Sequence, residues 1–227
     1  MIIAIDGPSG AGKSTLGKML AKNFNLLYLD TGAMYRAVGL AVLETNASFE
    51  DKARVAAIAR NSKIELVGEP EDLRIFLDGR NVSAEIRTNE VGQAASIVST
   101  VSEVRRILVE HQRTLGQNSA TGAVLDGRDI GTVVFPNADL KFFLTAKPEA
   151  RAVRRYTEDS EKGTATTYER TLAEINQRDE RDVSREDSPL QIAADAVVID
   201  TSELNLTEVF EQMLGITNEK IAQDTPV

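Results

Sequence analysis

The chain contains no cysteine and a single histidine. Without thiols it forms neither disulfides nor thiolate metal sites, which suits a reducing compartment. A single imidazole also excludes every mechanism that needs two histidines, as many zinc enzymes do. The histidine, His111, lies in a polar run, and we expect it to be a solvated helix residue without a functional role.

Tryptophan is absent as well, and aromatic residues make up only 5 % of the chain, whose net charge is −9. A field of this sign repels nucleic acid, and few side chains are available as base-stacking platforms. We therefore expect no nucleic-acid partner. A small anionic ligand remains compatible with this charge wherever basic residues gather locally.

Long apolar runs are missing too, since none approaches the ~20 residues needed to span a bilayer. Residues 1–7 have neither a basic start nor a cleavage site, and they are typical of a buried strand rather than a signal peptide. These absences predict a cytoplasmic protein that contacts no membrane. A length of 227 residues, 42 % of them hydrophobic, suits one domain with a small insertion.

Short apolar runs alternate with helical stretches along most of the chain. The runs are rich in Val, Ile, Leu and Phe without polar alternation, as in strands buried on both faces. They are residues 2–5, 26–29, 123–125, 140–144 and 196–199. Helices are expected at 13–23, 33–44, 50–60, 88–116, 148–182 and 206–215. The pattern predicts an α/β fold with a central parallel sheet flanked by helices.

Three features interrupt this rhythm. Gly92 and the Ser-Thr cluster at 99–102 predict a break in the fourth helix, and residues 163–167 predict an exposed loop in the fifth. Short strands at 63–67, 73–77 and 81–83, with turns at 68–70 and 78–79, predict a small antiparallel insertion. The last residues, about 222–227, are expected to fray.

A phosphate-binding loop follows the first predicted strand. The residues Gly7, Pro8, Ser9, Gly10, Ala11, Gly12, Lys13 and Ser14 fit the P-loop pattern of Gly, four residues, Gly, Lys and Ser or Thr. Glycines let successive backbone N–H groups turn inward to phosphate oxygens, and the next helix aims its positive end at the same place. Lys13 can reach the β- and γ-phosphates of ATP. Ser14 is the candidate Mg²⁺ ligand, and Thr15 offers a second hydroxyl.

The rest of the chain narrows the class of P-loop protein. It contains no guanine-reading Asn-Lys-x-Asp, and it is too short for a motor or a large ring ATPase, so kinases of small metabolites remain. Residues 151–185 hold seven arginines: 151, 154, 155, 170, 178, 181 and 185. Arginine grips phosphate oxygens with a planar fork, and phosphoryl transfer depends on alignment and charge neutralisation. The alternative is that each arginine pairs with a nearby carboxylate on a solvated helix face.

Longer motifs then identify a family. They are Asp6-Gly7-Pro8-Ser9-Gly10-Ala11-Gly12-Lys13, Leu29-Asp30-Thr31-Gly32-Ala33-Met34-Tyr35-Arg36, Asp126-Gly127-Arg128-Asp129-Ile130-Gly131-Thr132-Val133-Val134-Phe135-Pro136 and Arg178-Asp179-Glu180-Arg181-Asp182. With these motifs the chain resembles the bacterial cytidylate kinases, a family of nucleoside monophosphate kinases, from residue 3 to about residue 214.

The resemblance implies a single P-loop kinase domain over 1–227 that phosphorylates CMP, and dCMP, with Mg²⁺-ATP as a monomer. Its core would comprise about 1–30, 118–147 and 186–227. The monophosphate-binding region, with the β insertion, would cover about 31–117, and a helical lid about 148–185.

The resemblance also implies roles for particular residues. Arg36, Arg128 and Arg178 match positions that hold the acceptor phosphate, and Arg154 and Arg155 match the lid arm that neutralises the transferring phosphoryl group. Ser96, Arg105 and Asp129 match positions that read cytosine, and Asp182 and Arg185 match positions near the sugar. Thr31 stands where some members have serine, and either hydroxyl can hydrogen-bond the nucleotide.

Alternatives stay open at this point. Arg105 can form an exposed ion pair within its own helix, Ser96 can be a packing residue, and Asp30 and Asp126 end strands where they serve either a site or a turn. A kinase for UMP or another small metabolite is the nearest competing function. A nucleotide-binding regulator without turnover is disfavoured by Lys13 and the lid arginines, and a nucleic-acid-binding module by the net charge.

Overall fold

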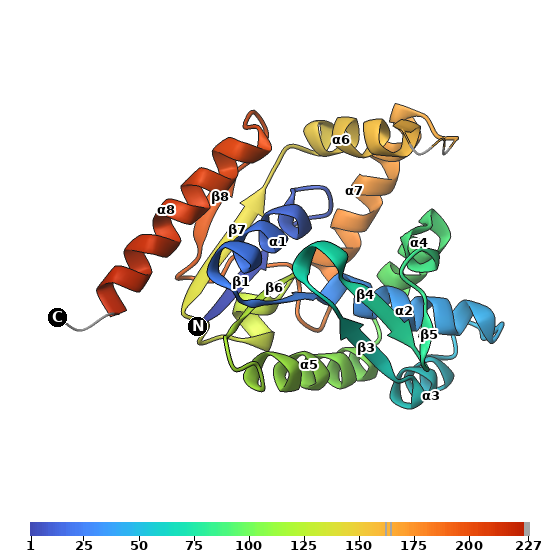
Figure 1. The fold of residues 1–227 in the computed structure, drawn as a ribbon. Helices are drawn as coiled ribbons and strands as arrows, with labels where there is room; N and C mark the ends of the chain where they lie inside the picture. Colours follow the sequence, from blue (N-terminus) through green and yellow to red (C-terminus); the bar gives the residue numbers. More distant parts are fainter. Residues whose placement is uncertain (162, 164, 225–227) are drawn as a thin grey trace.

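A parallel sheet forms the centre of the molecule in the computed structural model, which describes residues 1–161, 163 and 165–224. Its strands are β1 (Ile2–Asp6), β2 (Leu27–Asp30), β6 (Ala123–Gly127), β7 (Leu140–Thr145) and β8 (Val197–Asp200). Their order is β2-β6-β1-β7-β8, and every neighbouring pair is parallel (Figure 1). All five predicted strands are confirmed, within two residues of their expected ends.

Helices cover both faces of this sheet. On one face, α1 (Lys13–Phe24) and α8 (Leu206–Asp224) pack against Ile3 and Ile5 of β1. On the other face, α5 (Ser102–Gln117) and the π-helical turn η3 (Ile130–Val134) share a buried cluster with Ala4. Successive residues of a strand point to opposite faces, so a strand buried on both faces is apolar throughout. The prediction of a doubly covered parallel sheet is therefore confirmed.

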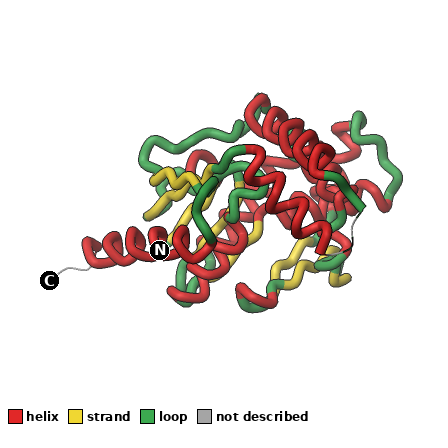
Figure 2. Tube along the Cα trace, turned by 90° about the horizontal axis from the view of Figure 1, so that it is seen from above, coloured by secondary structure: helices red, strands yellow, loops and turns green. Residues whose placement is uncertain are grey.

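Residues 31–98, between β2 and α5, form a second part of the fold beside the sheet. It contains α2 (Thr31–Glu44), α3 (Lys52–Asn61), β3 (Ile64–Val67), η1 (Pro70–Asp72), β4 (Arg74–Leu77), β5 (Arg80–Asn81), η2 (Glu85–Arg87) and α4 (Asn89–Val98). The strands form the predicted antiparallel sheet in the order β3-β4-β5, and Figure 2 shows the two sheets as separate groups. Val38, Val55, Ile75 and Val98 belong to one buried cluster that joins the helices to this sheet.

The predicted helix breaks are partly confirmed. The chain leaves the helical path between α4 and α5, at 99–101, as the Ser-Thr cluster indicates. Gly92, however, lies inside α4, where a Cβ would come within 3.2 Å of the Arg36 guanidinium. This glycine makes room for a side chain and does not end a helix. His111 on α5 is half-buried rather than solvated, and burial lowers the pKa of its imidazole.

Two helical arms, α6 (Pro148–Glu161) and α7 (Tyr168–Ser184), follow β7 and pack against each other; in the view of Figure 1, α6 lies above the phosphate loop and α7 runs down beside it. Their connection includes the predicted interruption, although residues 162 and 164 lie outside the described residues. Helix α8 runs to Asp224, past the expected end at 215, because Thr217 and Met213 are fully buried. Of the tail expected to fray, 225–227 lie outside the described residues.

No helix in the described part of the chain is long and apolar enough to cross a membrane.

Candidate active site

The glycines of the phosphate loop are required by its geometry. Gly7 has φ +144°, and a Cβ there would lie 2.0 Å from the carbonyl oxygen of Leu144, so only glycine fits between β1 and β7. Gly12 has φ 91° and precedes α1, whose first turn carries no side-chain cap and no acidic residue. The first N–H groups of α1 are thus available to an anion, as the strand–loop–helix context predicts.

Lys13 is buried at the start of α1 and donates a 2.7 Å hydrogen bond to the carbonyl oxygen of Pro8. Burial lowers the pKa of this ammonium well below its usual value, and the nearby Arg128 lowers it further. A buried cation that is repelled by another cation is stabilised when a polyanion enters. Lys13 is therefore placed to bind phosphate.

Ser14 and Asp126 meet at the carboxyl ends of the strands. The Ser14 hydroxyl donates to Asp126 Oδ2 at 2.7 Å, and the Tyr28 hydroxyl donates to Asp126 Oδ1 at 2.8 Å. Burial, and then the charge of Asp30, raises the pKa of Asp126 to about 6. Hydroxyl and carboxylate oxygens are ligands that Mg²⁺ accepts, with phosphates and water completing its octahedron. The described residues contain no group of three or more carboxylate or imidazole side chains that could hold a metal ion.

Asp30, the other strand-end carboxylate, has a mainly structural role. Its Oδ1 accepts the Ala33 N–H at 2.8 Å and caps α2, while its Oδ2 pairs with Arg87 at 3.1 Å. The sequence left both Asp30 and Asp126 open between a site and a turn, and slightly favoured a site role for Asp126. The structure separates them because a helix begins directly after Asp30, whereas Asp126 faces the phosphate loop.

A cavity of about 620 Å³ joins the phosphate loop to the second part of the fold. Its wall includes all the site residues predicted from the sequence except Gly7 and Pro8, namely Ser9, Gly10, Ala11, Gly12, Lys13, Ser14, Thr15, Thr31, Arg36, Ser96, Arg105, Arg128, Asp129, Arg154, Arg155, Arg178, Asp182 and Arg185. Residues from six separate stretches of sequence thus face one space.

Three arginines from different elements line this cavity. Arg36 on α2 donates to the carbonyl oxygen of Ile86 at 2.7 Å, and Arg128 Nε pairs with Asp182 at 2.8 Å. Arg178 on α7 has no carboxylate within 4.0 Å among the described residues, and its buried Nε has no hydrogen-bond partner. Burial, followed by Arg128, lowers the pKa of Arg178 to about 9. A half-buried group of like charges with unused donors is suited to a phosphate dianion.

The arginines of the two arms differ in whether they pair with carboxylates or remain available to bind phosphate. Arg151, Arg155 and Arg170 form ion pairs with Asp179, Asp159 and Glu174, but only the Arg170 pair has the solvated position of the alternative, since Arg151 is 2 % exposed. Arg154 donates to both the hydroxyl and the carbonyl oxygen of Thr201, which also lines the cavity. Arg178 is half-buried, and neither an ion pair nor a side-chain hydrogen bond of its guanidinium is found among the described residues.

Arg105 and Asp129 bring hydrogen-bond donors and acceptors side by side in the cavity wall. Arg105 and Asp129 form a buried ion pair whose side chains are 4 % and 7 % exposed, and the guanidinium lies 5.6 Å from the Tyr35 ring centroid. Arg105 is therefore not the exposed intrahelical ion pair of the alternative. Its Nε has no hydrogen-bond partner, which leaves a donor for a ligand.

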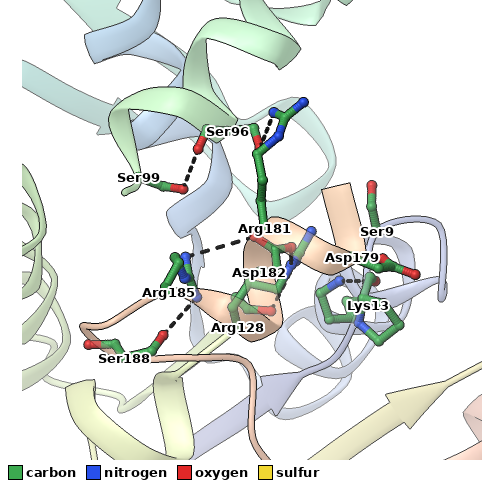
Figure 3. A network of polar contacts seen from close by, with 12 residues as sticks. Ser9, Lys13, Ser96, Ser99, Arg128, Asp179, Arg181, Asp182, Arg185 and Ser188 are labelled. Atoms are coloured by element: carbon green, nitrogen blue, oxygen red, sulfur yellow. Dashed lines mark hydrogen bonds and ion pairs between the residues drawn. The ribbon is translucent and has the colours of Figure 1, made fainter. Parts of the chain in front are cut away.

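Ser96 has a partner that the sequence did not indicate. Arg181 on α7 donates to the Ser96 hydroxyl at 2.9 Å, and Figure 3 shows its side chain reaching from the arm to α4. Below it, Asp182 accepts from Arg128 and lies 3.9 Å from Arg185 (Figure 3). Burial alone would raise the pKa of Asp182, but Arg128, Arg178 and Arg185 outweigh it and lower that pKa.

Sequence reasoning missed several residues of the cavity wall. Tyr35, Arg87, Glu158, Thr201 and residues 204–206 line it without having been named as site residues. For Thr201 a signal existed, because it follows strand β8 and ligands of parallel sheets bind beyond the carboxyl ends of strands. No local pattern points to the others.

Asp6 positions the segment that carries Arg128 and Asp129. Its two carboxylate oxygens accept the backbone N–H groups of Ile130 and Gly131 at 2.8 and 2.7 Å. Burial raises the pKa of Asp6 from 3.8 to about 6, although the two N–H groups oppose this shift. The carboxylate therefore joins the end of β1, just before the phosphate loop, to the start of η3.

Asp6 gives stability a testable dependence on pH. Between pH 3.8 and about 6, the folded protein keeps a proton on Asp6 that the unfolded chain has lost, so this group lowers the free energy of unfolding as the pH rises. Asp6→Asn does not titrate. From about pH 4 to about pH 7, the free energy of unfolding of the variant should rise by about 2 kcal/mol relative to wild type. Urea denaturation at several pH values measures this difference, and a constant difference contradicts the assignment.

Fold and cavity together define the chain as a P-loop phosphotransferase, with a phosphate loop, a cluster of arginines and two helical arms around one space. The model of the family "Cytidylate kinase" matches residues 3–219. A cytidylate kinase of Caldanaerobacter subterraneus subsp. tengcongensis is 53 % identical over 211 residues, which cover 93 % of this chain and 92 % of that protein. A cytidylate kinase of Geobacter sp. (strain M21) is 46 % identical and covers 98 % of this chain, with 95 % of that protein covered.

Among solved structures, an uncharacterized protein from Eubacterium ventriosum has the same fold, with a TM-score of 0.51 and 11 % identity over 96 % of this chain and 98 % of that one. The chain belongs to the cytidylate kinase family, and it is an ATP-dependent nucleoside monophosphate kinase. The resemblance of the sequence motifs is thereby confirmed.

Proposed function

We propose that this enzyme transfers the γ-phosphoryl group of Mg²⁺-ATP to CMP, and to dCMP, as a step in pyrimidine nucleotide metabolism. The observation that carries the proposal is that one cavity holds the phosphate loop, an unpaired arginine and a buried donor–acceptor pair. In this assignment, about 31–117 binds the monophosphate and about 148–185 forms the lid.

Transfer proceeds by in-line attack of a CMP phosphate oxygen on the γ-phosphorus, giving CDP and ADP. The acceptor needs no general base because a phosphate monoester is already anionic at neutral pH. Arg36, Arg128 and Arg178 hold the acceptor phosphate, while Lys13 holds the β- and γ-phosphates. Catalysis then comes from alignment and charge neutralisation. Mg²⁺, held beside Ser14 and Asp126, would supply further neutralisation of the triphosphate.

The choice of cytosine follows from the buried pair. Cytosine presents an amino donor and acceptors at N3 and O2. Asp129 accepts from the amino group, and Arg105 donates to a ring acceptor, so the two residues match one edge of this base. Uracil presents an N–H at position 3 and an oxygen at position 4, which would leave both protein groups mismatched inside a buried site.

Measurement of ADP formation with CMP, dCMP, UMP, AMP, GMP and dTMP as separate acceptors tests the proposal. Turnover with CMP and dCMP, far above the other four, is the expected result. Preferential turnover of UMP or another acceptor would replace the cytosine assignment. Absence of turnover with all six would remove the proposed reaction altogether.

Asp129→Asn should reduce the discrimination between CMP and UMP. An amide can donate as well as accept, so it tolerates the uracil oxygen that the carboxylate repels. We expect kcat/KM for CMP to fall roughly 100-fold, and the preference for CMP over UMP to fall at least about tenfold. Thr132→Val, which changes another side chain of the same segment, serves as the control. An unchanged CMP/UMP ratio in Asp129→Asn would refute the role of this carboxylate.

A further inference from the structure

Arg151 is a large charged side chain that the site described above does not use. It lies in the first turn of α6, is 2 % exposed, and is absent from the wall of the main cavity. A buried guanidinium is tolerated only where its charge is paired and its N–H groups are bonded. The partners of Arg151 therefore indicate which parts of the fold this buried guanidinium holds together.

The guanidinium of Arg151 joins three parts of the fold. Its Nε donates to the carbonyl oxygen of Ala146 at 2.9 Å, just after β7. Its Nη1 donates to the carbonyl oxygen of Ser9 in the phosphate loop at 3.0 Å. Both terminal nitrogens bind the carboxylate of Asp179 on α7, at 3.1 and 2.5 Å. This two-pronged geometry needs a planar fork, which lysine lacks.

Packing adds a fourth connection. A Cβ at Gly10 would lie 3.2 Å from the Cβ of Arg151, so the loop backbone rests directly on the stem of this side chain. In Figure 3, Ser9 and Asp179 lie next to each other beside Lys13. The loop is thus held against the bases of both arms by hydrogen bonds and by contact.

The neighbours of the pair are the residues that face phosphate. Asp179 directly follows Arg178, and Arg154 and Arg155 lie one helical turn after Arg151. From this arrangement we infer that Arg151 and Asp179 are positioning residues that fix Arg178 and the arm arginines relative to Lys13. The pair touches no reacting atom. This inference rests on the proposed function, because it concerns the alignment of the same phosphates.

The test compares the kinetics of Arg151→Lys, Asp179→Asn and the double variant with those of wild type, using the best acceptor of the panel. Each single variant should lower kcat about 30- to 100-fold, because a misplacement near 1 Å costs a factor of this size. The KM for the acceptor should change less than about threefold. The double variant should be no worse than the poorer single variant, since both changes break one connection.

A matched control is available on α7, the helix that carries Asp179. Arg170 and Glu174 form an exposed ion pair on α7, and Arg170→Lys and Glu174→Gln should leave kcat within about twofold of wild type. Circular dichroism at the assay temperature gives the folded fraction of each variant. A kcat that returns to the wild-type value after correction for that fraction overturns the inference, and so does additive loss in the double variant.

The proposed function and the positioning role of Arg151 and Asp179 are tested by separate quantities. Wild-type turnover in the same assay tests the proposed function, whereas the ratio of each variant to wild type tests the positioning pair. Normal wild-type turnover with unchanged kcat in both single variants overturns the positioning role alone.

Discussion

Lys13→Met should lower kcat by about 10³-fold or more with every acceptor nucleotide. Lys13 is the buried cation of the phosphate loop, where burial and Arg128 already lower the pKa of its ammonium. The negative charge of the bound triphosphate compensates the buried ammonium. The attraction between this ammonium and the phosphates strengthens as negative charge develops during transfer. Because this role concerns ATP, the loss should be independent of the acceptor base. Steady-state kinetics with CMP and with the next-best acceptor measure it.

Lys22→Met is the matched control for this prediction. Lys22 lies on the same helix, but its side chain is 62 % exposed and pairs with Glu71 on the surface. We expect its kcat to stay within about twofold of wild type, since exposed ion pairs contribute little. Comparable losses of kcat in the two variants would show that removal of any positive charge from α1 lowers activity. That result would refute the specific role of Lys13.

Arg178→Met should have effects of opposite sign on activity and on stability. Burial and the charges of Arg128 and Arg36 lower the pKa of Arg178 to about 9, and its Nε lacks a partner. Removal of this unpaired charge should raise the melting temperature of the ligand-free protein by about 2 °C or more. It should also lower kcat by about 10³-fold, the scale at which arginines act in phosphoryl transfer. Functional residues commonly reduce stability in this way.

Differential scanning calorimetry and kinetics on the same preparation check both signs. Arg170→Met provides the control, because Arg170 lies on the same helix with 69 % of its side chain exposed. Neither its melting temperature nor its kcat should change appreciably. A lower melting temperature for Arg178→Met would mean that Arg178 stabilises the free protein, and retained activity would exclude it from the site.

The sequence was sufficient to predict those features whose pattern lies in consecutive residues. The phosphate loop occupies eight consecutive residues, from Gly7 to Ser14, and its neighbours form the strand and helix that the motif requires. The five core strands were found because burial on both faces demands an unbroken apolar run. The end of α8 was missed because the helix continues past residue 215 with contacts to other elements, such as those of Ile216.

Side-chain partners far apart in the sequence were decided only by the tertiary structure. Asp30 and Asp126 both end strands, yet one caps the next helix, whereas the other binds Ser14, which is 112 residues away. The arginines of the arms also look alike in sequence, but Arg170 is exposed and paired, while Arg178 is half-buried and unpaired among the described residues.

The sequence by itself therefore determined the kind of chemistry, because a phosphate loop is built from backbone N–H groups in one short segment. Only the tertiary structure decided which charged side chains line the cavity and which pair with other elements. Burial and pairing depend on the distance between residues that the chain brings together from separate elements, as it does with Ser9, Arg151 and Asp179.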